Sequence, residues 1–208
     1  MEKKENRKQK STLRNVLEWI MTFVAAVVIA LPVRAFAFEL VRVDGISMQH
    51  TLADGEIMLV SKYDYSTTWF TLPWQDDRTK ENAARLTFGG DPRRFDVVVC
   101  RYPGRGDTNF VKRVVGIPGD VVEIREGYLY VNGTMYEEEY ITDEFRVRGG
   151  SNGLNYGPCT VPDGQYFVMG DHRNNSNDSR AQGCIGRDMI VGHVRSVVYP
   201  FGEIRGVQ

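Results

Sequence analysis

Three short segments of this chain combine residue types that could carry out chemistry. The segment "GISMQHTL", residues 45–52, contains Ser47, and "FVKRVVGIPGD", residues 110–120, contains Lys112 within an apolar run. The segment "GDHRNNSNDSR", residues 170–180, is dense in opposite charges, hydroxyls and amides. Because a serine hydroxyl is a weak nucleophile that needs a base to take its proton, the first question is which residue would serve Ser47 as the base.

Histidine is one class of base, and the chain has His50, His172 and His193. His50 follows Ser47 by only three positions, but in an extended segment such residues point to opposite faces, so the spacing does not favour a pair. His172 and His193 lie in contexts that are equally typical of structural or exposed histidines. A Ser/His/Asp hydrolase that uses His172 or His193 is therefore one open hypothesis.

Lysine is the other class of base. With an ordinary pKa of ~10.4 an ammonium cannot accept a proton at neutral pH, whereas burial lowers that pKa by disfavouring the charge. In a strand, Phe110, Lys112 and Val114 would share one face, and Arg113 would lie on the other. This alternation fits a buried Lys112, and it fits equally an exposed edge-strand lysine with Arg113 pointing inward.

The segment 170–180 follows an apolar run, "QYFVM". It packs two aspartates, two arginines, two serines and three asparagines into eleven positions. Such a composition is typical of a surface turn rich in Asx hydrogen bonds, and it also suits a polar network that supports a site.

The segments that must position these residues have the residue pattern of a β protein. Runs rich in β-branched and aromatic residues are bounded by Gly, Pro, Asp or Asn, which predicts many short strands and a mainly β fold. Glu126-Gly127 and Asn132-Gly133 are hairpin turn signals. The best helical pattern after the N-terminal region covers 77–88. The predicted strand segments are 38–45, 55–65, 95–103, 109–117, 119–133, 164–171 and 192–202.

The N-terminal region is basic and then apolar. Residues 1–14 carry six basic and two acidic side chains, and Trp19–Val33 is a run of 15 residues without a charge. With its flanks the run is long enough to cross a bilayer. A cleaved secretory signal, with Ala35-Phe36-Ala37 as an A-x-A site, and an uncleaved anchor fit the pattern about equally. Both place the basic end in the cytoplasm and the body outside.

Composition bears on nucleic-acid binding, disulfide bonds, metal sites and membrane contact. The net charge of −1 gives no reason to expect nucleic acid as a partner. Cys100, Cys159 and Cys184 are too few for a disulfide framework, and either three buried thiols or one Cys159–Cys184 disulfide fits. No Cys-x-x-Cys or Cys/His cluster predicts a metal site. Trp69 and Trp74 either pack within a loop or contact a membrane interface.

Taken together, these segments make the chain similar to the bacterial type I signal peptidases, the membrane-anchored leader peptidase family. The resemblance runs from the basic N-terminus to about Val197. "GISMQHTL" resembles the nucleophile motif Gly-x-Ser-Met-x-Pro-Thr-Leu, and "RFDVVVCRYP" resembles a strand that normally begins Gly-Asp-Ile/Val-Val. "FVKRVVGIPGD" is similar to the general-base motif. "GDHRNNSNDSR" resembles the terminal motif, which usually begins Gly-Asp-Asn-Arg.

The resemblance implies a catalytic dyad. Ser47 would be the nucleophile, Lys112 the general base, and Ser176 would hydrogen-bond the lysine amine and orient it. Met48 would line the substrate cleft. Some members carry a hydroxyl two residues before the nucleophile as an oxyanion donor, but that position is Gly45 here, so the backbone N–H of Ser47 would serve instead.

The resemblance also implies two supporting ion pairs. Asp178 would pair with Arg180, and Asp171 would pair with Arg113. Both pairs would support the dyad without taking part in the reaction.

Three positions depart from the family's motifs. His50 stands where proline is usual, Phe95 where the strand motif has glycine, and His172 where asparagine is usual. None of the three removes a catalytic group. His50 is interpreted as a structural substitution at a turn, which it would loosen because proline fixes φ and histidine does not.

The function implied is that of a membrane-anchored serine endopeptidase that removes N-terminal signal peptides from exported preproteins after Ala-x-Ala-like sites. Residues 1–15 would be a cytoplasmic tail, 16–38 a single transmembrane helix that stays as an anchor, and 39–208 an extracytoplasmic antiparallel β-sheet domain. Residues 121–160 would form a hairpin sub-domain. The partners would be preproteins and the phospholipid membrane, without cofactor, metal or nucleic acid. A membrane-tethered, non-catalytic β-domain or a degenerate peptidase is the alternative.

Overall fold

The computed structural model describes residues 14–30, 37–69, 85–106, 108–147 and 154–207. The chain divides into two compact units, Met1–Phe38 and Glu39–Gln208. In the first unit residues 14–30 are helical, and their side chains are exposed, including the large apolar Trp19 and Phe23. Among the residues that the structure describes, no helix combines the length and apolar character needed to span a bilayer.

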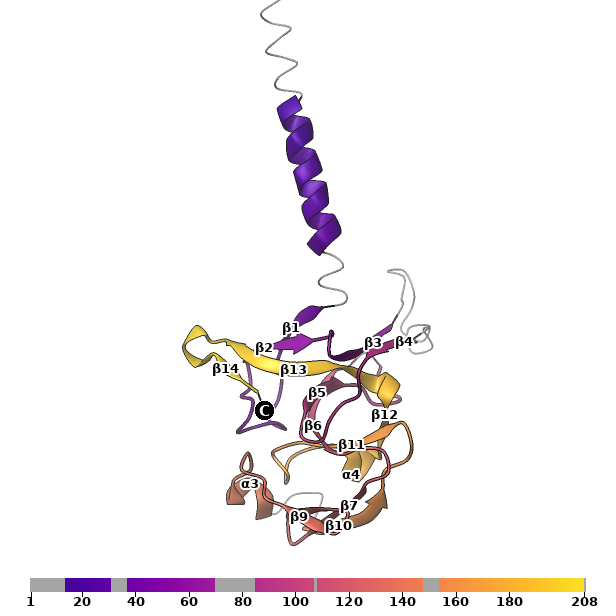
Figure 1. Cartoon of the computed structure of the whole chain (residues 1–208). Helices are drawn as coiled ribbons and strands as arrows, with labels where there is room; N and C mark the ends of the chain where they lie inside the picture. Colours follow the sequence, from indigo (N-terminus) through magenta and orange to yellow (C-terminus); the bar gives the residue numbers. More distant parts are fainter. Residues whose placement is uncertain (1–13, 31–36, 70–84, 107, 148–153, 208) are drawn as a thin grey trace, which may run out of the picture. The chain divides into compact units, whose positions relative to one another are not determined.

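The second unit is built on an eight-stranded sheet in the order β1-β2-β13-β5-β6-β11-β12, with β14 beside β13 (Figure 1). The ladders from β2 to β12 are antiparallel. The prediction of a mainly β, antiparallel fold is therefore confirmed. The strands of this sheet are β1 (Phe38–Arg42), β2 (Ile57–Ser61), β5 (Val97–Cys100), β6 (Phe110–Gly116), β11 (Gln165–Met169), β12 (Ile185–Gly186), β13 (Ile190–Tyr199) and β14 (Arg205–Gly206).

A second sheet of four strands, in the order β10-β7-β8-β9, comes from the segment predicted as a hairpin sub-domain. Its tight turns are those expected from the sequence, because Glu126-Gly127 and Asn132-Gly133 all have positive φ, as a type I′ hairpin turn requires. The strands are β7 (Val121–Arg125), β8 (Tyr128–Val131), β9 (Thr134–Tyr136) and β10 (Tyr156–Thr160), and the short helix α3 (Asp143–Val147) lies between β9 and β10 in the chain.

A two-stranded ribbon is formed by β3 (Tyr65–Trp69) and β4 (Arg85–Gly89). The helix predicted over 77–88 is wrong at its end, because 85–88 belong to β4, where cross-strand pairing with β3 decides the conformation. Residues 77–84 and Trp74 lie outside the described residues. The remaining short elements are the helix α4 (Ser179–Gln182) and the 3₁₀ turns Arg187–Met189 and Phe201–Glu203.

Three buried clusters hold the second unit together. The first joins Met48 and Leu52 to side chains of β2, β5 and β13, so the segment after Ser47 is fixed to the sheet. The second lies along β5, β6, β11 and β12. The third packs side chains of β6 and β11, among them Phe167, against Val122 and Leu129 of the small sheet. The small sheet is thereby fixed to the strand that carries Lys112.

Candidate active site

The segment that carries Ser47 is a series of tight turns. The backbone N–H of Gln49 donates to Ile46 O at 3.0 Å, and that of Leu52 donates to Met48 O at 2.8 Å. Met48 and Leu52 are 2% and 0% exposed, so both side chains anchor the turns in the first core cluster. Ser47 is thus held by hydrogen bonds within the segment and by apolar packing on its C-terminal side.

Lys112 lies next to Ser47 in space. Its Nζ is 2.6 Å from Ser47 Oγ and 2.9 Å from the carbonyl oxygen of Val111. β6 is an interior strand of the sheet, since it pairs with β5 on one side and β11 on the other, and Lys112 on it is only 2% exposed. The alternative of an exposed edge-strand lysine is therefore wrong, since both Lys112 and Arg113 are buried.

Burial lowers the pKa of Lys112, because removing water disfavours the ammonium. The carboxylates of Asp178 and Asp171 act in the opposite direction, and Arg180 adds to the lowering. Cys100 is fully buried nearby, and burial raises the pKa of its thiol to about 12. The thiol is therefore neutral at physiological pH and does not stabilise a charged Lys112. The site favours an amine that can accept a proton.

Arg113 and Asp171 form a buried ion pair. Arg113 Nε and Nη2 donate to the two carboxylate oxygens at 2.9 and 2.8 Å, and the side chains are 1% and 0% exposed. Arg113 also donates to Phe95 O at 2.9 Å and to Thr51 Oγ1 at 3.2 Å. The pair thus ties β6 to the segment after β11 and to the turns after Ser47.

Asp178 and Arg180 form the second ion pair. Arg180 Nε and Nη2 donate to Asp178 at 2.9 and 2.8 Å. Burial alone would raise the pKa of Asp178, but hydrogen bonds from Arg180, the Gly170 N–H and Ser176 outweigh it and lower that pKa. The expected contact of Ser176 with the Lys112 amine stays a prediction.

Gly170 is a site residue that sequence reasoning missed. A Cβ at this position would lie 2.3 Å from Ser176 Oγ and 2.5 Å from Ser47 O. Its N–H donates to Asp178 at 3.0 Å. The absence of a side chain here lets the segment with Ser176 approach the Ser47 backbone. The signal was present in the "GD" that opens the last motif, but a glycine there is also typical of any turn.

A second group missed from the sequence is a buried pair that connects the loop after β9 to this segment. Glu138 accepts hydrogen bonds from both terminal nitrogens of Arg173, with one at 2.8 Å, and from Tyr140 Oη at 2.7 Å. Arg173 Nε donates to Gly170 O at 3.2 Å, and the Arg113 guanidinium lies 3.7 Å from the centre of the Tyr140 ring. Contacts between residues so far apart in sequence leave no local pattern.

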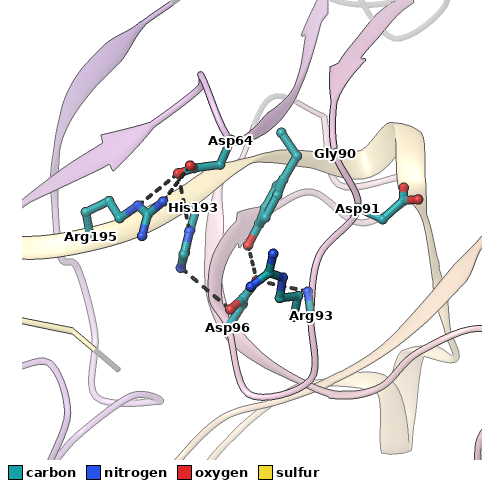
Figure 2. A pocket seen from close by; sticks show the side chains of 8 residues that line it. Asp64, Gly90, Asp91, Arg93, Asp96, His193 and Arg195 are labelled. Atoms are coloured by element: carbon teal, nitrogen blue, oxygen red, sulfur yellow. Dashed lines mark hydrogen bonds and ion pairs between the residues drawn. The ribbon is translucent and has the colours of Figure 1, made fainter.

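The histidines do not meet the Ser47 hydroxyl. His172 Nδ1 lies 3.2 Å from Ile46 O, whereas Ser47 Oγ accepts its hydrogen bond from Lys112. His193 lies in a separate pocket of about 320 Å³, where Figure 2 shows it between the carboxylates of Asp64 and Asp96. Its ring nitrogens are 3.4 and 3.8 Å from those carboxylates. This arrangement gives no support to a Ser/His/Asp site that includes Ser47.

Two departures from the family's motifs fall at unusual backbone conformations. His50 has φ of 91° and Phe95 has φ of 75°, a region that L-residues with large side chains rarely adopt. Glycine, the usual residue at position 95, would be free of this strain. Proline fixes φ near −65°, so the backbone at His50 has a conformation that a proline cannot adopt.

Met48 is buried in the core, and its predicted place in a substrate cleft stays a prediction. Cys100, Cys159 and Cys184 are free thiols, so the alternative of a Cys159–Cys184 disulfide is not the state of this structure. In the part of the chain that the structure describes, no group of three or more His, Cys, Asp or Glu residues is arranged to hold a metal.

Comparison with known proteins matches residues 16–199 to the family described as signal peptidase, peptidase S26. A signal peptidase I of Bacillus licheniformis is 35% identical over 208 residues, which cover 98% of this chain and 97% of that protein. Signal peptidase I T of Bacillus subtilis is 36% identical over 94% of this chain and 92% of its own length. A crystal structure of a signal peptidase I from Enterococcus faecalis is 33% identical, with a TM-score of 0.43, and covers 50% of this chain and 97% of that one.

Proposed function

This chain belongs to the bacterial signal peptidase I family, peptidase S26, and we propose that its serine endopeptidase activity on signal peptides uses Ser47 as the nucleophile and Lys112 as the general base. The observation that carries the proposal is the 2.6 Å separation of Lys112 Nζ and Ser47 Oγ inside a buried environment. A nucleophile and a base within hydrogen-bond reach, with the base desolvated, are the requirements for this chemistry.

The reaction begins with neutral Lys112 taking the Ser47 hydroxyl proton as Oγ attacks the scissile carbonyl. The new bond gives a tetrahedral intermediate whose oxyanion accepts a hydrogen bond from the Ser47 backbone N–H. Collapse of the intermediate releases the amine half of the substrate, which leaves with a proton from Lys112. A water molecule, deprotonated by Lys112, then hydrolyses the ester and regenerates the enzyme.

The surrounding polar residues support the dyad without taking part in bond changes. Ser176 orients the Lys112 amine, and the Asp178–Arg180 pair holds the Ser176 segment in place. The hydrogen bond from the Gly170 N–H to Asp178 supports that role. The Arg113–Asp171 pair holds β6 at a fixed distance from the turns after Ser47, in keeping with the contact between Arg113 and Thr51.

The substrates are preproteins that carry signal peptides. We propose that the peptide binds in an extended conformation along strand edges near Ser47, with small side chains at the positions one and three before the cut. Such sites are the Ala-x-Ala type found at the ends of secretory signals. Met48 contributes to the wall of that cleft in this proposal.

The location at a membrane is a proposal as well. Residues 16–38 would anchor the chain by a single crossing, with residues 1–15 in the cytoplasm and 39–208 outside. The exposed apolar side chains of the helix at 14–30 support an apolar surrounding for it, because Trp19 and Phe23 are 77% and 70% exposed. The phospholipid membrane would then be a partner, and the A-x-A at 35–37 would be incidental or a site of self-cleavage.

Precursor processing by the full chain in detergent tests the dyad. Ser47→Ala and Lys112→Ala should each abolish cleavage of an Ala-x-Ala precursor while circular dichroism shows an unchanged fold. His193→Asn and His172→Asn should retain measurable cleavage, whereas a Ser/His/Asp hydrolase would lose activity with one of them. Cleavage that persists in Lys112→Ala would reject Lys112 as the base.

A further inference from the structure

Two of the three departures from the family's motifs meet at one place in the fold. The rings of His50 and His172 both contact the ring of Phe145, which comes from helix α3. The centroid of Phe145 is 5.5 Å from that of His50, in an edge-on arrangement, and 4.1 Å from that of His172. The three side chains therefore form one ring cluster, His50–Phe145–His172.

The ring cluster is joined to both ends of the turn that carries the nucleophile. His172 donates its backbone N–H to Ser47 O at 3.1 Å, and its Nδ1 lies 3.2 Å from Ile46 O. A carbonyl oxygen only accepts, so Nδ1 carries the proton in this contact. At the other end, His50 is three residues after Ser47 and contributes its ring to the same cluster.

Phe145 is itself held to the segment that follows His172. The backbone N–H of Asn174 donates to Phe145 O at 3.3 Å, and Asn174 Nδ2 donates to Glu144 O at 3.2 Å. The N–H of Phe145 donates to Thr142 O at 3.0 Å within the first turn of α3. These bonds fix the backbone that carries the Phe145 ring.

We propose that the His50–Phe145–His172 cluster positions Ser47 toward Lys112, a role that rests on the proposed dyad. In the family's motif a proline restricts the backbone three residues after the nucleophile, since proline fixes φ. Here φ of His50 is 91°, which no proline can adopt. The rings replace that restriction by packing, and the imidazole of His172 adds a hydrogen bond to the residue before Ser47. All three are positioning residues, because none contacts the Ser47 hydroxyl.

The test is steady-state cleavage of a peptide with an Ala-x-Ala site by the full chain in detergent, with kcat and KM measured separately. His172→Phe keeps a ring against Phe145 but loses the hydrogen bond to Ile46 O. It should lower kcat about threefold to tenfold, the value of one hydrogen bond, with KM unchanged. Phe145→Leu should also lower kcat, and the double variant should lose less than the product of the two single losses, because the residues act as a unit.

Position 50 gives an independent test of the backbone. His50→Gly removes the ring but accepts a positive φ, so it should lower kcat modestly. His50→Pro should lower it further, because the turn itself must change. Turnover of His50→Pro equal to or above that of His50→Gly would overturn the proposal.

His193 supplies the matched control. Its ring stacks on Tyr65 at 5.3 Å. Figure 2 shows His193 in the separate pocket, which no residue of the ring cluster lines, so His193→Phe should leave kcat unchanged. Ring variants with unchanged kcat, beside an inactive Lys112→Ala, would reject the cluster and leave the dyad standing. An active Lys112→Ala would reject the dyad itself. Loss of stability without loss of kcat in the folded fraction would also reject positioning.

Discussion

Gly170→Ala adds one methyl group at the point where the two serine segments approach each other. Gly170 does not have a positive φ, so alanine is compatible with the backbone and the effect is purely steric. The added Cβ would lie 2.3 Å from Ser176 Oγ, 2.6 Å from Ser176 Cβ and 2.5 Å from Ser47 O. Rotation of the Ser176 hydroxyl relieves only the first contact.

The size of the displacement follows from these distances. Cβ atoms essentially never approach other heavy atoms within 3.0 Å. The Ser47 carbonyl or the backbone at 170 must therefore move by at least about 0.5 Å, and by about 1 Å to reach an ordinary van der Waals contact. A 1 Å misplacement of reacting groups can reduce the rate about 100-fold. The strain should lower the free energy of unfolding by about 1–3 kcal/mol, as is usual for overpacking.

The assay is cleavage of an Ala-x-Ala precursor by wild type and variant, with the folded fraction followed by thermal denaturation. Gly202→Ala is the matched control, because a Cβ there has nothing within 4 Å and should change neither rate nor stability. A folded Gly170→Ala enzyme with a rate within threefold of wild type would refute the claim that this approach positions Ser47.

Three further predictions concern the charged groups. Only the neutral amine of Lys112 accepts a proton, and burial lowers the pKa of that amine. We therefore expect kcat/KM to rise with pH through a midpoint below the ordinary pKa of ~10.4. A midpoint at ~10.4 itself would contradict the assignment of Lys112 as the base. Asp171→Ala leaves the Arg113 guanidinium buried without its partner and should lower the free energy of unfolding by about 3–5 kcal/mol in urea titrations, whereas Glu123→Ala, in an exposed pair, should leave the midpoint unchanged. The lowered pKa of Asp178 means that its contribution to stability is complete above the unfolded value of ~3.9 and is lost as pH falls through the folded pKa. Between about pH 5 and pH 2, the free energy of unfolding of Asp178→Asn should therefore fall less than that of wild type. Parallel curves of unfolding free energy against pH for the two proteins would argue against this role of Asp178.

The sequence predicted those features that depend on neighbouring residues, namely strand alternation and tight turns. The alternation around Lys112 and Arg113 fits β6, and the two Gly-containing turn pairs formed the hairpins expected of them. Where pairing with a distant strand competes with a helical pattern, as at 85–88, the local prediction failed.

The rest of the site depends on contacts that local sequence does not encode. The Glu138–Arg173 pair joins residues 35 positions apart, and the need for glycine at position 170 arises from the Ser47 carbonyl, which belongs to a different segment. The positive φ of His50 could not be read from a motif in which proline is usual, because the substitution changes the backbone as well as the side chain.

Lys112 and Arg113 are neighbours on β6, and each has a task that the other cannot perform. In the observed register Lys112 pairs with Val98 and Arg113 with Val97. A slip of one residue would exchange the two side chains between the faces of the sheet. A guanidinium in place of Lys112 could not give up its proton at any physiological pH, and an ammonium in place of Arg113 could not make the two parallel hydrogen bonds to Asp171. A misregistered chain would thus be inactive and would also bury a charge without a suitable partner. The two adjacent side chains that serve catalysis and support therefore also disfavour the slipped alignment of β6.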